Sequence, residues 1–209
     1  MRKITKQIPL AVALFGSLAA TQVATAAVSG NLGFSSEYVF RGILQATSSA
    51  SAGLDYSHDS GIYVGTWAGK VDLGLEYDLY AGYGNEYQGF SYDINYTTYN
   101  YTDDAFDDTY KEFNIGLGYG PVSVGYADGT WDGYGSSSDY TVTTVSLSQM
   151  GWTLLYGDYG KDATGSWYEL GYSTTVGDFD TGINYIKSDK DLDDQDYLIF
   201  SVGKTIDIM

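Results

Sequence analysis

Large apolar residues alternate with small or polar ones along most of this chain after Ser29. Between Phe113 and Tyr119, every odd position is large and apolar, and every even position is small or polar. The segments that begin at Leu75 and Phe90 show the same two-residue period. Successive side chains of a β-strand point to opposite faces, so this period predicts strands with one apolar face. Helical spacing is not sustained over three turns in any segment, and the chain is therefore predicted to be all-β.

The alternating segments predict about twelve strands of about ten residues each. Strands of that length, when tilted, cross the apolar band of an outer membrane, which is about 25 Å tall. The expected ranges are 31–41, 48–57, 62–70, 75–84, 90–100, 110–120, 122–131, 139–149, 152–159, 166–176, 179–188 and 196–205.

Short and long connections alternate between these expected strands. The brief connections, after every second strand, are 58–61, 85–89, 120–121, 150–151 and 177–178. Most of the others are longer and more polar, such as 101–109, 132–138 and 189–196. Outer-membrane barrels have short periplasmic turns and longer outer loops. The pattern therefore predicts a single antiparallel transmembrane β-barrel. A soluble β-sandwich, the alternative all-β fold, gives no reason for this alternation.

The first 27 residues have the features of a secretory signal peptide. Arg2, Lys3 and Lys6 form a basic start, an apolar stretch follows over 8–20, and 24–26 supplies the small-x-small pattern that precedes cleavage. The apolar stretch has about 13 residues, whereas a membrane-spanning helix needs about 20. Cleavage is expected after residue 26 or 27. The alternative is an N-terminal membrane anchor that stays attached.

Removal of residues 1–27 makes the chain more acidic. The whole chain has a net charge of −17, and the leader contains three positive and no negative residues, which leaves −20 on residues 28–209. A protein this acidic repels the phosphates of nucleic acids, and nucleic acid is therefore not an expected partner. The same charge favours cations over anions as ligands or solutes. The absence of cysteine excludes disulfides and thiolate-held groups, and no cofactor is expected.

Three features of the composition fit a membrane barrel. The chain contains 22 Tyr, whose apolar ring and polar tip suit the membrane interface. It also contains 27 Gly, and Pro121 is the single proline beyond the leader. Proline is disfavoured in such strands because it removes a ladder hydrogen bond that hydrocarbon cannot replace.

Several charged residues fall on the strand face opposite the large apolar side chains. A charge that faces lipid at mid-depth costs a few kcal/mol, so these residues are expected to face the lumen. The candidate lumen and selectivity residues are Glu37, Arg41, Asp55, Glu76, Asp78, Asp93 and Glu169. Two interpretations stay open: a cation-preferring pore, whose carboxylates stabilise a passing cation, and a plugged interior in which Arg41 pairs with Glu37 and neighbouring carboxylates. Twelve strands leave room for a narrow passage, whereas eight are filled by side chains.

The outer loops contain runs of aspartate. One run is Asp103, Asp104, Asp107 and Asp108, and the other is Asp189, Asp191, Asp193, Asp194 and Asp196. The second run does not match a calcium-binding loop, because its sixth position is Asp194 instead of Gly and its twelfth is Phe200 instead of Glu. No metal site is expected. The runs are interpreted as solvated loops, with a loose divalent-ion bridge to lipopolysaccharide as the alternative.

The sequence has no convincing enzymatic motif. His58 is the single histidine, and it falls in an expected periplasmic turn, away from any outer-leaflet nucleophile. The glycines at 116, 118 and 120 lie along one side of a strand with no helix after them, so they do not form a nucleotide-binding loop. The chain is therefore not expected to be an enzyme.

The first segment after the leader resembles the opening of the TorF family of porins. The matching residues are Tyr38, Val39, Phe40, Arg41, Gly42, Ile43 and Gln45, and a second similar block covers 54–67. The resemblance is dense from residue 31 to about 125 and thins afterwards. It departs from the family at Gly69 and Lys70, and at the C-terminal Met209, where such barrels often end in Phe as a signal for the barrel assembly machinery.

The resemblance implies a pore in the outer membrane of a Gram-negative bacterium. Together with the lumen residues, it predicts a porin-like channel for passive diffusion of small hydrophilic solutes, with a preference for cations. Its expected partners are membrane lipids, lipopolysaccharide, the barrel assembly machinery and the solutes themselves. The alternative is a closed structural barrel whose acidic loops bind the cell surface or a partner.

Overall fold

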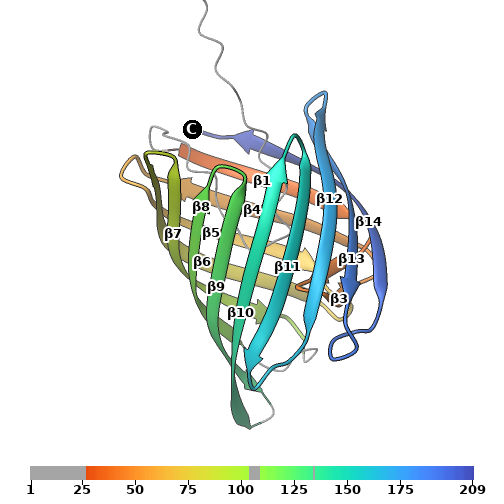
Figure 1. Ribbon diagram of the computed structural model, residues 1–209. Helices are drawn as coiled ribbons and strands as arrows, with labels where there is room; N and C mark the ends of the chain where they lie inside the picture. The colour runs from red at the N-terminus through yellow and green to blue at the C-terminus, as the bar shows by residue number, and fades with distance from the viewer. Residues whose placement is uncertain (1–26, 104–108, 134) are drawn as a thin grey trace, which may run out of the picture.

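The computed structural model describes residues 27–103, 109–133 and 135–209. Twelve strands of this described part close into one antiparallel barrel, and the first of them pairs with both the next barrel strand and the last (Figure 1). They are β1 (Ala27–Ser35), β4 (Ser49–Ser57), β5 (Ile62–Lys70), β6 (Leu75–Tyr87), β7 (Phe90–Tyr101), β8 (Tyr110–Tyr119), β9 (Val122–Gly133), β10 (Ser136–Gln149), β11 (Trp152–Lys161), β12 (Ser166–Val176), β13 (Phe179–Ser188) and β14 (Asp196–Asp207). The predicted all-β barrel is confirmed.

The chain leaves the barrel wall once among the described residues, between β1 and β4. There β2 (Tyr38–Phe40) and β3 (Ile43–Ala46) pair with each other and with no barrel strand. The strand expected over 31–41 is therefore wrong beyond Ser35, where β1 ends. Past Ser35 the alternation gives way to three consecutive apolar residues, 38–40, which belong to the separate hairpin, where Tyr38 and Val39 are both buried against protein.

The two ends of the barrel differ. The brief connections 58–61, 88–89, 120–121, 150–151 and 177–178 all lie at the end where β1 begins and β14 finishes. We call this the turn end and the opposite end, where β2 and β3 connect, the loop end. One expected outer loop, 132–138, is wrong, because β9 continues to Gly133 and β10 already begins at Ser136.

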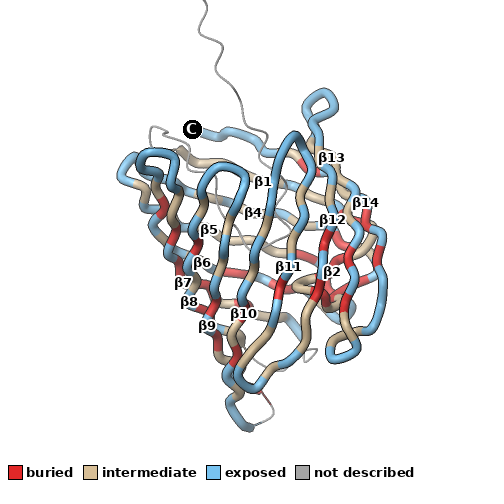
Figure 2. Tube along the Cα trace, in the orientation of Figure 1, coloured by how far each residue is buried: buried red, intermediate tan, exposed pale blue. Residues whose placement is uncertain are grey.

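Buried or half-buried residues alternate with exposed ones along the barrel strands (Figure 2). The exposed positions of the alternation form the outer face. Exposed aromatic rings lie at two levels of this outer face. The level near the turn end contains Tyr83, Phe90, Tyr119, Trp152, Tyr172 and Phe179, and the level nearer the loop end contains Tyr77, Tyr96, Phe113, Tyr126, Tyr156, Tyr168 and Tyr185. Exposed Leu, Ile and Val residues lie between them, such as Leu79, Leu117 and Leu154. Two aromatic girdles around an apolar band are typical of barrels that sit in a bilayer.

Residues 1–26 lie outside the described part, and so does nearly all of the expected signal peptide. Ala27 is the first residue of β1 and pairs with Ser57. Within the described residues, no helix is long and apolar enough to cross a membrane.

Candidate functional site

The hairpin formed by residues 38–46, here called the lumen hairpin, lies inside the barrel and enters from the loop end (Figure 1). Its two-residue turn consists of Arg41 and Gly42, with φ angles of 49° and 82°. Positive φ at both central residues is typical of the type I′ turn, which suits the right-handed twist of a hairpin. Glycine is required at the second position, since an added Cβ would lie 2.8 Å from Trp167 Cβ.

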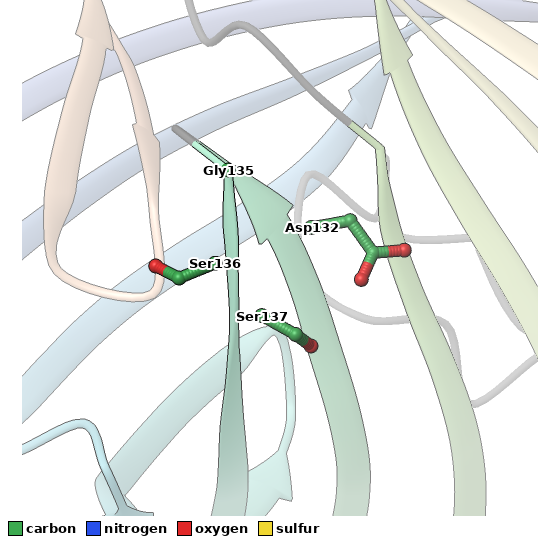
Figure 3. A pocket seen from close by; sticks show the side chains of 4 residues that line it. All are labelled: Asp132, Gly135, Ser136 and Ser137. Carbon is green, nitrogen blue, oxygen red and sulfur yellow. The ribbon is translucent and has the colours of Figure 1, made fainter.

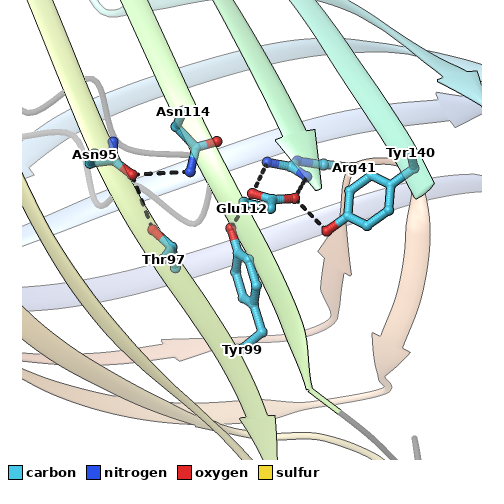
Figure 4. A network of polar contacts seen from close by, with 7 residues as sticks. All are labelled: Arg41, Asn95, Thr97, Tyr99, Glu112, Asn114 and Tyr140. Carbon is cyan, nitrogen blue, oxygen red and sulfur yellow. Dashed lines mark hydrogen bonds and ion pairs between the residues drawn. The ribbon is translucent and has the colours of Figure 1, made fainter. Parts of the chain in front are cut away.

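The turn of the lumen hairpin contacts the wall made by β7, β8 and β10. The Arg41 guanidinium donates to both carboxylate oxygens of Glu112, at 2.5 and 3.0 Å (Figure 4). Tyr99 and Tyr140 donate their hydroxyls to the same carboxylate, at 2.9 and 2.7 Å. Glu112 is buried, so the free energy of its charge depends on these four donors.

Both edges of the lumen hairpin also contact the wall. On one side, Tyr38 Oη donates to Glu76 Oε1 at 2.8 Å, and the Tyr38 ring lies 5.7 Å from that of Trp67 on β5. On the other side, Ser188 Oγ donates to the Gly42 carbonyl, and the Leu44 N–H donates to Asp193 Oδ2 at 2.7 Å. The hairpin thus crosses the bore from wall to wall.

Apolar packing holds the lumen hairpin on the same two sides. Val39 belongs to a buried cluster with Trp167 and Ile186 from β12 and β13. Tyr38 belongs to a second cluster with Ala46 and Val71. The loop-end half of the barrel therefore has a packed interior, like the core of a globular protein.

The turn-end half of the lumen is lined differently. Its inward positions are small and polar and are partly exposed, among them Asn31, Ser51, Ser91, Ser123, Ser146 and Ser201. Ser123 and Ser146 share a hydrogen bond of 2.6 Å across β9 and β10. We call this half the polar vestibule. Side chains this small leave room for water and for small solutes.

Carboxylates on the inner wall accept hydrogen bonds from side chains of the same strand or of nearby strands. Asp55 accepts from Tyr80 and, at 3.1 Å, from Asn31. Asp93 accepts from Tyr63 and Asn95, both at 2.7 Å. Glu169 accepts from Trp167 Nε1 at 2.7 Å and from Asn184 at 3.2 Å.

Asp78 is different from these carboxylates. It is 8% exposed, and among the described residues its Oδ1 has no hydrogen-bond donor. Asp55, Glu76, Asp78, Asp93 and Glu169 all lie on the inner wall, where the alternation places them.

The family of the chain follows from a comparison of sequences. Residues 19–204 match the family model described as "Bacterial protein of unknown function (Gcw_chp)". The chain belongs to the Gcw_chp family. That description does not contain the name TorF, so the likeness to that family stays a resemblance. A search of curated proteins finds no match.

Solved structures similar to this Gcw_chp protein are membrane barrels of low sequence identity. One is titled "KdgM porin"; it has a TM-score of 0.56 and 6% identity, over 88% of this chain and 99% of that one. Another, from a study of in-meso crystallisation of membrane proteins, has a TM-score of 0.56 and 11% identity, over 86% of this chain and 84% of that one. Because these sequence identities are low, the comparison shows a shared barrel fold and nothing further.

Two expectations about the Gcw_chp lumen are corrected. Glu37 lies in the connection between β1 and β2, not on a wall strand, because β1 ends at Ser35. In the alternative of a plugged interior, which paired Arg41 with Glu37 and neighbouring carboxylates, the pair with Glu37 is wrong, since Arg41 binds another lumen carboxylate, Glu112. Glu112 itself was missed, although its even position, next to the outward-facing Phe113, places it on the inner face. The other missed signal is Gly42, because glycine readily takes the positive φ that the second position of a tight hairpin turn requires.

The acidic loop 189–195 has a structural role. Asp189 accepts from the Ser166 N–H and hydroxyl, at 2.8 and 2.9 Å. Desolvation raises the pKa of Asp189, but the hydrogen bonds from Ser166 and from the backbone N–H groups of Asp191 and Leu192 outweigh this effect and lower the pKa. Asp193 accepts from Tyr197 as well as from the lumen hairpin. The interpretation of this loop as merely solvated is therefore wrong for these two residues.

The remaining sequence candidates lie away from the lumen. His58 is exposed in the turn after β4 and contacts Ser60. In the other acidic run Asp103 is described, whereas 104–108 lie outside the described residues. Nowhere in the described ranges do three His, Cys, Asp or Glu side chains form a group that could hold a metal ion.

A small pocket lies at the loop end of β9 and β10. It is lined by Asp132, Gly135, Ser136 and Ser137 (Figure 3). The charged residue of this lining, Asp132, already pairs with Lys111 at 2.9 Å. The lumen is therefore the better candidate for a functional site.

Proposed function

We propose that this protein is a porin-like channel of the outer membrane of a Gram-negative bacterium, through which small hydrophilic solutes diffuse passively. The supporting observation is a closed barrel with an apolar outer band between two aromatic girdles and a polar vestibule inside. A lipid-facing surface of this kind would be unstable in water, and a polar interior of this kind suits passage of hydrated solutes.

The proposed channel prefers cations. Asp55, Asp78, Asp93 and Glu169 face the lumen as carboxylates. Arg41 brings a positive charge into the same space, but its ion pair with Glu112 neutralises that charge. Unpaired negative charge in a narrow, low-dielectric passage stabilises cations and repels anions.

The proposal includes a secretory leader over residues 1–27 and an orientation with the turn end in the periplasm. Export and insertion would then require the barrel assembly machinery, and the loop end would face lipopolysaccharide. The support is the basic and apolar start of the sequence and the placement of the short turns at one end.

Planar-bilayer recording of the refolded mature protein tests the channel. Discrete conductance steps are expected, and a salt gradient should give a reversal potential of the sign that cation selectivity requires. Folding is checked by the different gel mobility of unheated and boiled samples. Folded, inserted protein that never conducts would contradict the proposal.

A closed structural barrel with binding loops is the second candidate, because the lumen hairpin crosses the bore and is anchored at both edges. A variant in which a Gly-Ser turn replaces residues 37–47 distinguishes the two. If both proteins conduct and the variant does so with larger steps, the hairpin is a constriction in a channel. If only the variant conducts, the native barrel is closed and the second candidate is correct.

A further inference from the structure

Asp78 is a buried carboxylate with an unsatisfied oxygen. Asp55, Asp93 and Glu169 each accept from two donors and Glu76 accepts from Tyr38, whereas Asp78 Oδ1 has no donor among the described residues. A buried polar group without a partner is costly, and a buried charge without one is more costly still. The site therefore needs a positive charge, a proton or water at this oxygen.

Among the side chains that the structure describes around Asp78, none supplies that charge. Glu76 lies two residues away on the same strand, and its carboxylate already accepts from Tyr38. Both terminal nitrogens of Arg41 are bound to Glu112, so the charge of this guanidinium is already neutralised by another carboxylate. On the adjacent strands, Asp78 is paired in register with Trp67 and Tyr99. Glu76, Asp78 and Glu112 therefore lie near a single cationic side chain, Arg41, which is already bound to Glu112.

We propose that Asp78 is the centre of a binding site for a small monovalent cation, at the level where the lumen hairpin covers the wall. A divalent ion is disfavoured, since Ca²⁺ and Mg²⁺ take several oxygen ligands and the described residues offer no group of three acidic ligands. A monovalent ion can be neutralised by a single carboxylate, and it retains or gives up water at a lower cost than a divalent ion. The role of this site as a stopping point for permeating cations rests on the proposed channel function, but binding itself does not.

Thallous ion is a suitable probe, because it is a monovalent cation that quenches tryptophan fluorescence on close approach. Trp67 lies opposite Asp78 on the neighbouring strand and serves as the reporter. The mature barrel, folded in detergent micelles, would be titrated with thallous nitrate at constant ionic strength with choline nitrate. We expect a saturable component of quenching that potassium nitrate reverses.

Asp78→Asn should abolish this component or raise its midpoint at least about tenfold. Asp93→Asn is the matched control: it removes another lumen carboxylate, one that has donors from Tyr63 and Asn95, and should leave the saturable component in place. Quenching that is linear in the wild type, or equally saturable in Asp78→Asn, would overturn the site and would indicate a protonated or hydrated Asp78.

If Asp78→Asn does not fold, a second measurement on the wild type takes the place of the variant comparison: the line width of the ²⁰⁵Tl nuclear magnetic resonance. Wild-type protein should broaden the line, and potassium should reverse the broadening; no broadening would overturn the site. The two proposals fail separately. Thallous binding without any bilayer current would keep the site and remove the channel, whereas conductance without saturable binding would do the opposite.

Discussion

Arg41 and Glu112 lie 71 positions apart in the chain, yet they form a two-pronged ion pair across the barrel bore. Arg41 is at the turn of the lumen hairpin, and Glu112 is on β8. The pair therefore connects an insertion between the first barrel strands to the opposite wall. Its loss is expected to release the hairpin from that wall.

Arg41→Ala should destabilise the protein by about 3 kcal/mol, because it leaves the Glu112 charge buried with only two tyrosine donors. The double variant Arg41→Ala/Glu112→Ala should lose less free energy of unfolding than the sum of the losses in the two single variants. Urea unfolding of the barrel in lipid vesicles measures all four proteins. Strictly additive costs would show that the pair does not anchor the hairpin.

Gly42→Ala should displace the lumen hairpin, since its Cβ would meet Trp167 and its φ is 82°. Gly135→Ala is the matched control, with a φ of 79° and open space around it. The control should lose about 1 kcal/mol of unfolding free energy because of its positive φ alone. Gly42→Ala should lose about 1–3 kcal/mol more because its Cβ also meets Trp167. Hydrogen exchange should then be faster over residues 38–46 in Gly42→Ala alone. Equal exchange in both variants would contradict the close packing.

Removal of lumen charge should reduce the proposed selectivity. Asp55→Asn combined with Asp93→Asn keeps hydrogen-bonding side chains near Tyr80 and Tyr63 but removes two negative charges. The reversal potential in a salt gradient should move toward zero. Asp158→Asn, an exposed position on β11, is the control and should leave the potential unchanged. An equal shift in the control would place the selectivity outside the lumen.

The loop 189–195 should open in acid. The folded pKa of Asp189 is lowered, so its hydrogen bonds to Ser166 contribute stability above the unfolded value of about 4, and this contribution is lost as pH falls through the lowered pKa. Amide exchange of Ser166, corrected for its intrinsic pH dependence, should accelerate below about pH 4. Asp189→Ala should show fast exchange at every pH. Protection of Ser166 that persists at pH 2 would contradict this prediction.

The alternation of residues determined the fold to a large extent. In a barrel wall each residue faces either lipid or lumen, so a period of two is imposed by local chemistry alone, as between Phe113 and Tyr119. The same rule placed Asp55, Glu76, Asp78, Asp93 and Glu169 on the inner face. These properties need only the position of a residue relative to its neighbours in the chain.

The tertiary structure decided what fills the bore. Tyr38 and Val39 are adjacent and both buried, at 3% and 2% exposure, which a membrane-facing wall strand does not allow. Their burial comes from Trp67 on one side and Trp167 on the other, partners far away in the chain. The sequence by itself determined a barrel with an acidic interior. Long-range contacts, which no local pattern encodes, decide that residues 38–46 cross this interior. They also decide that Arg41 binds Glu112 instead of Glu37.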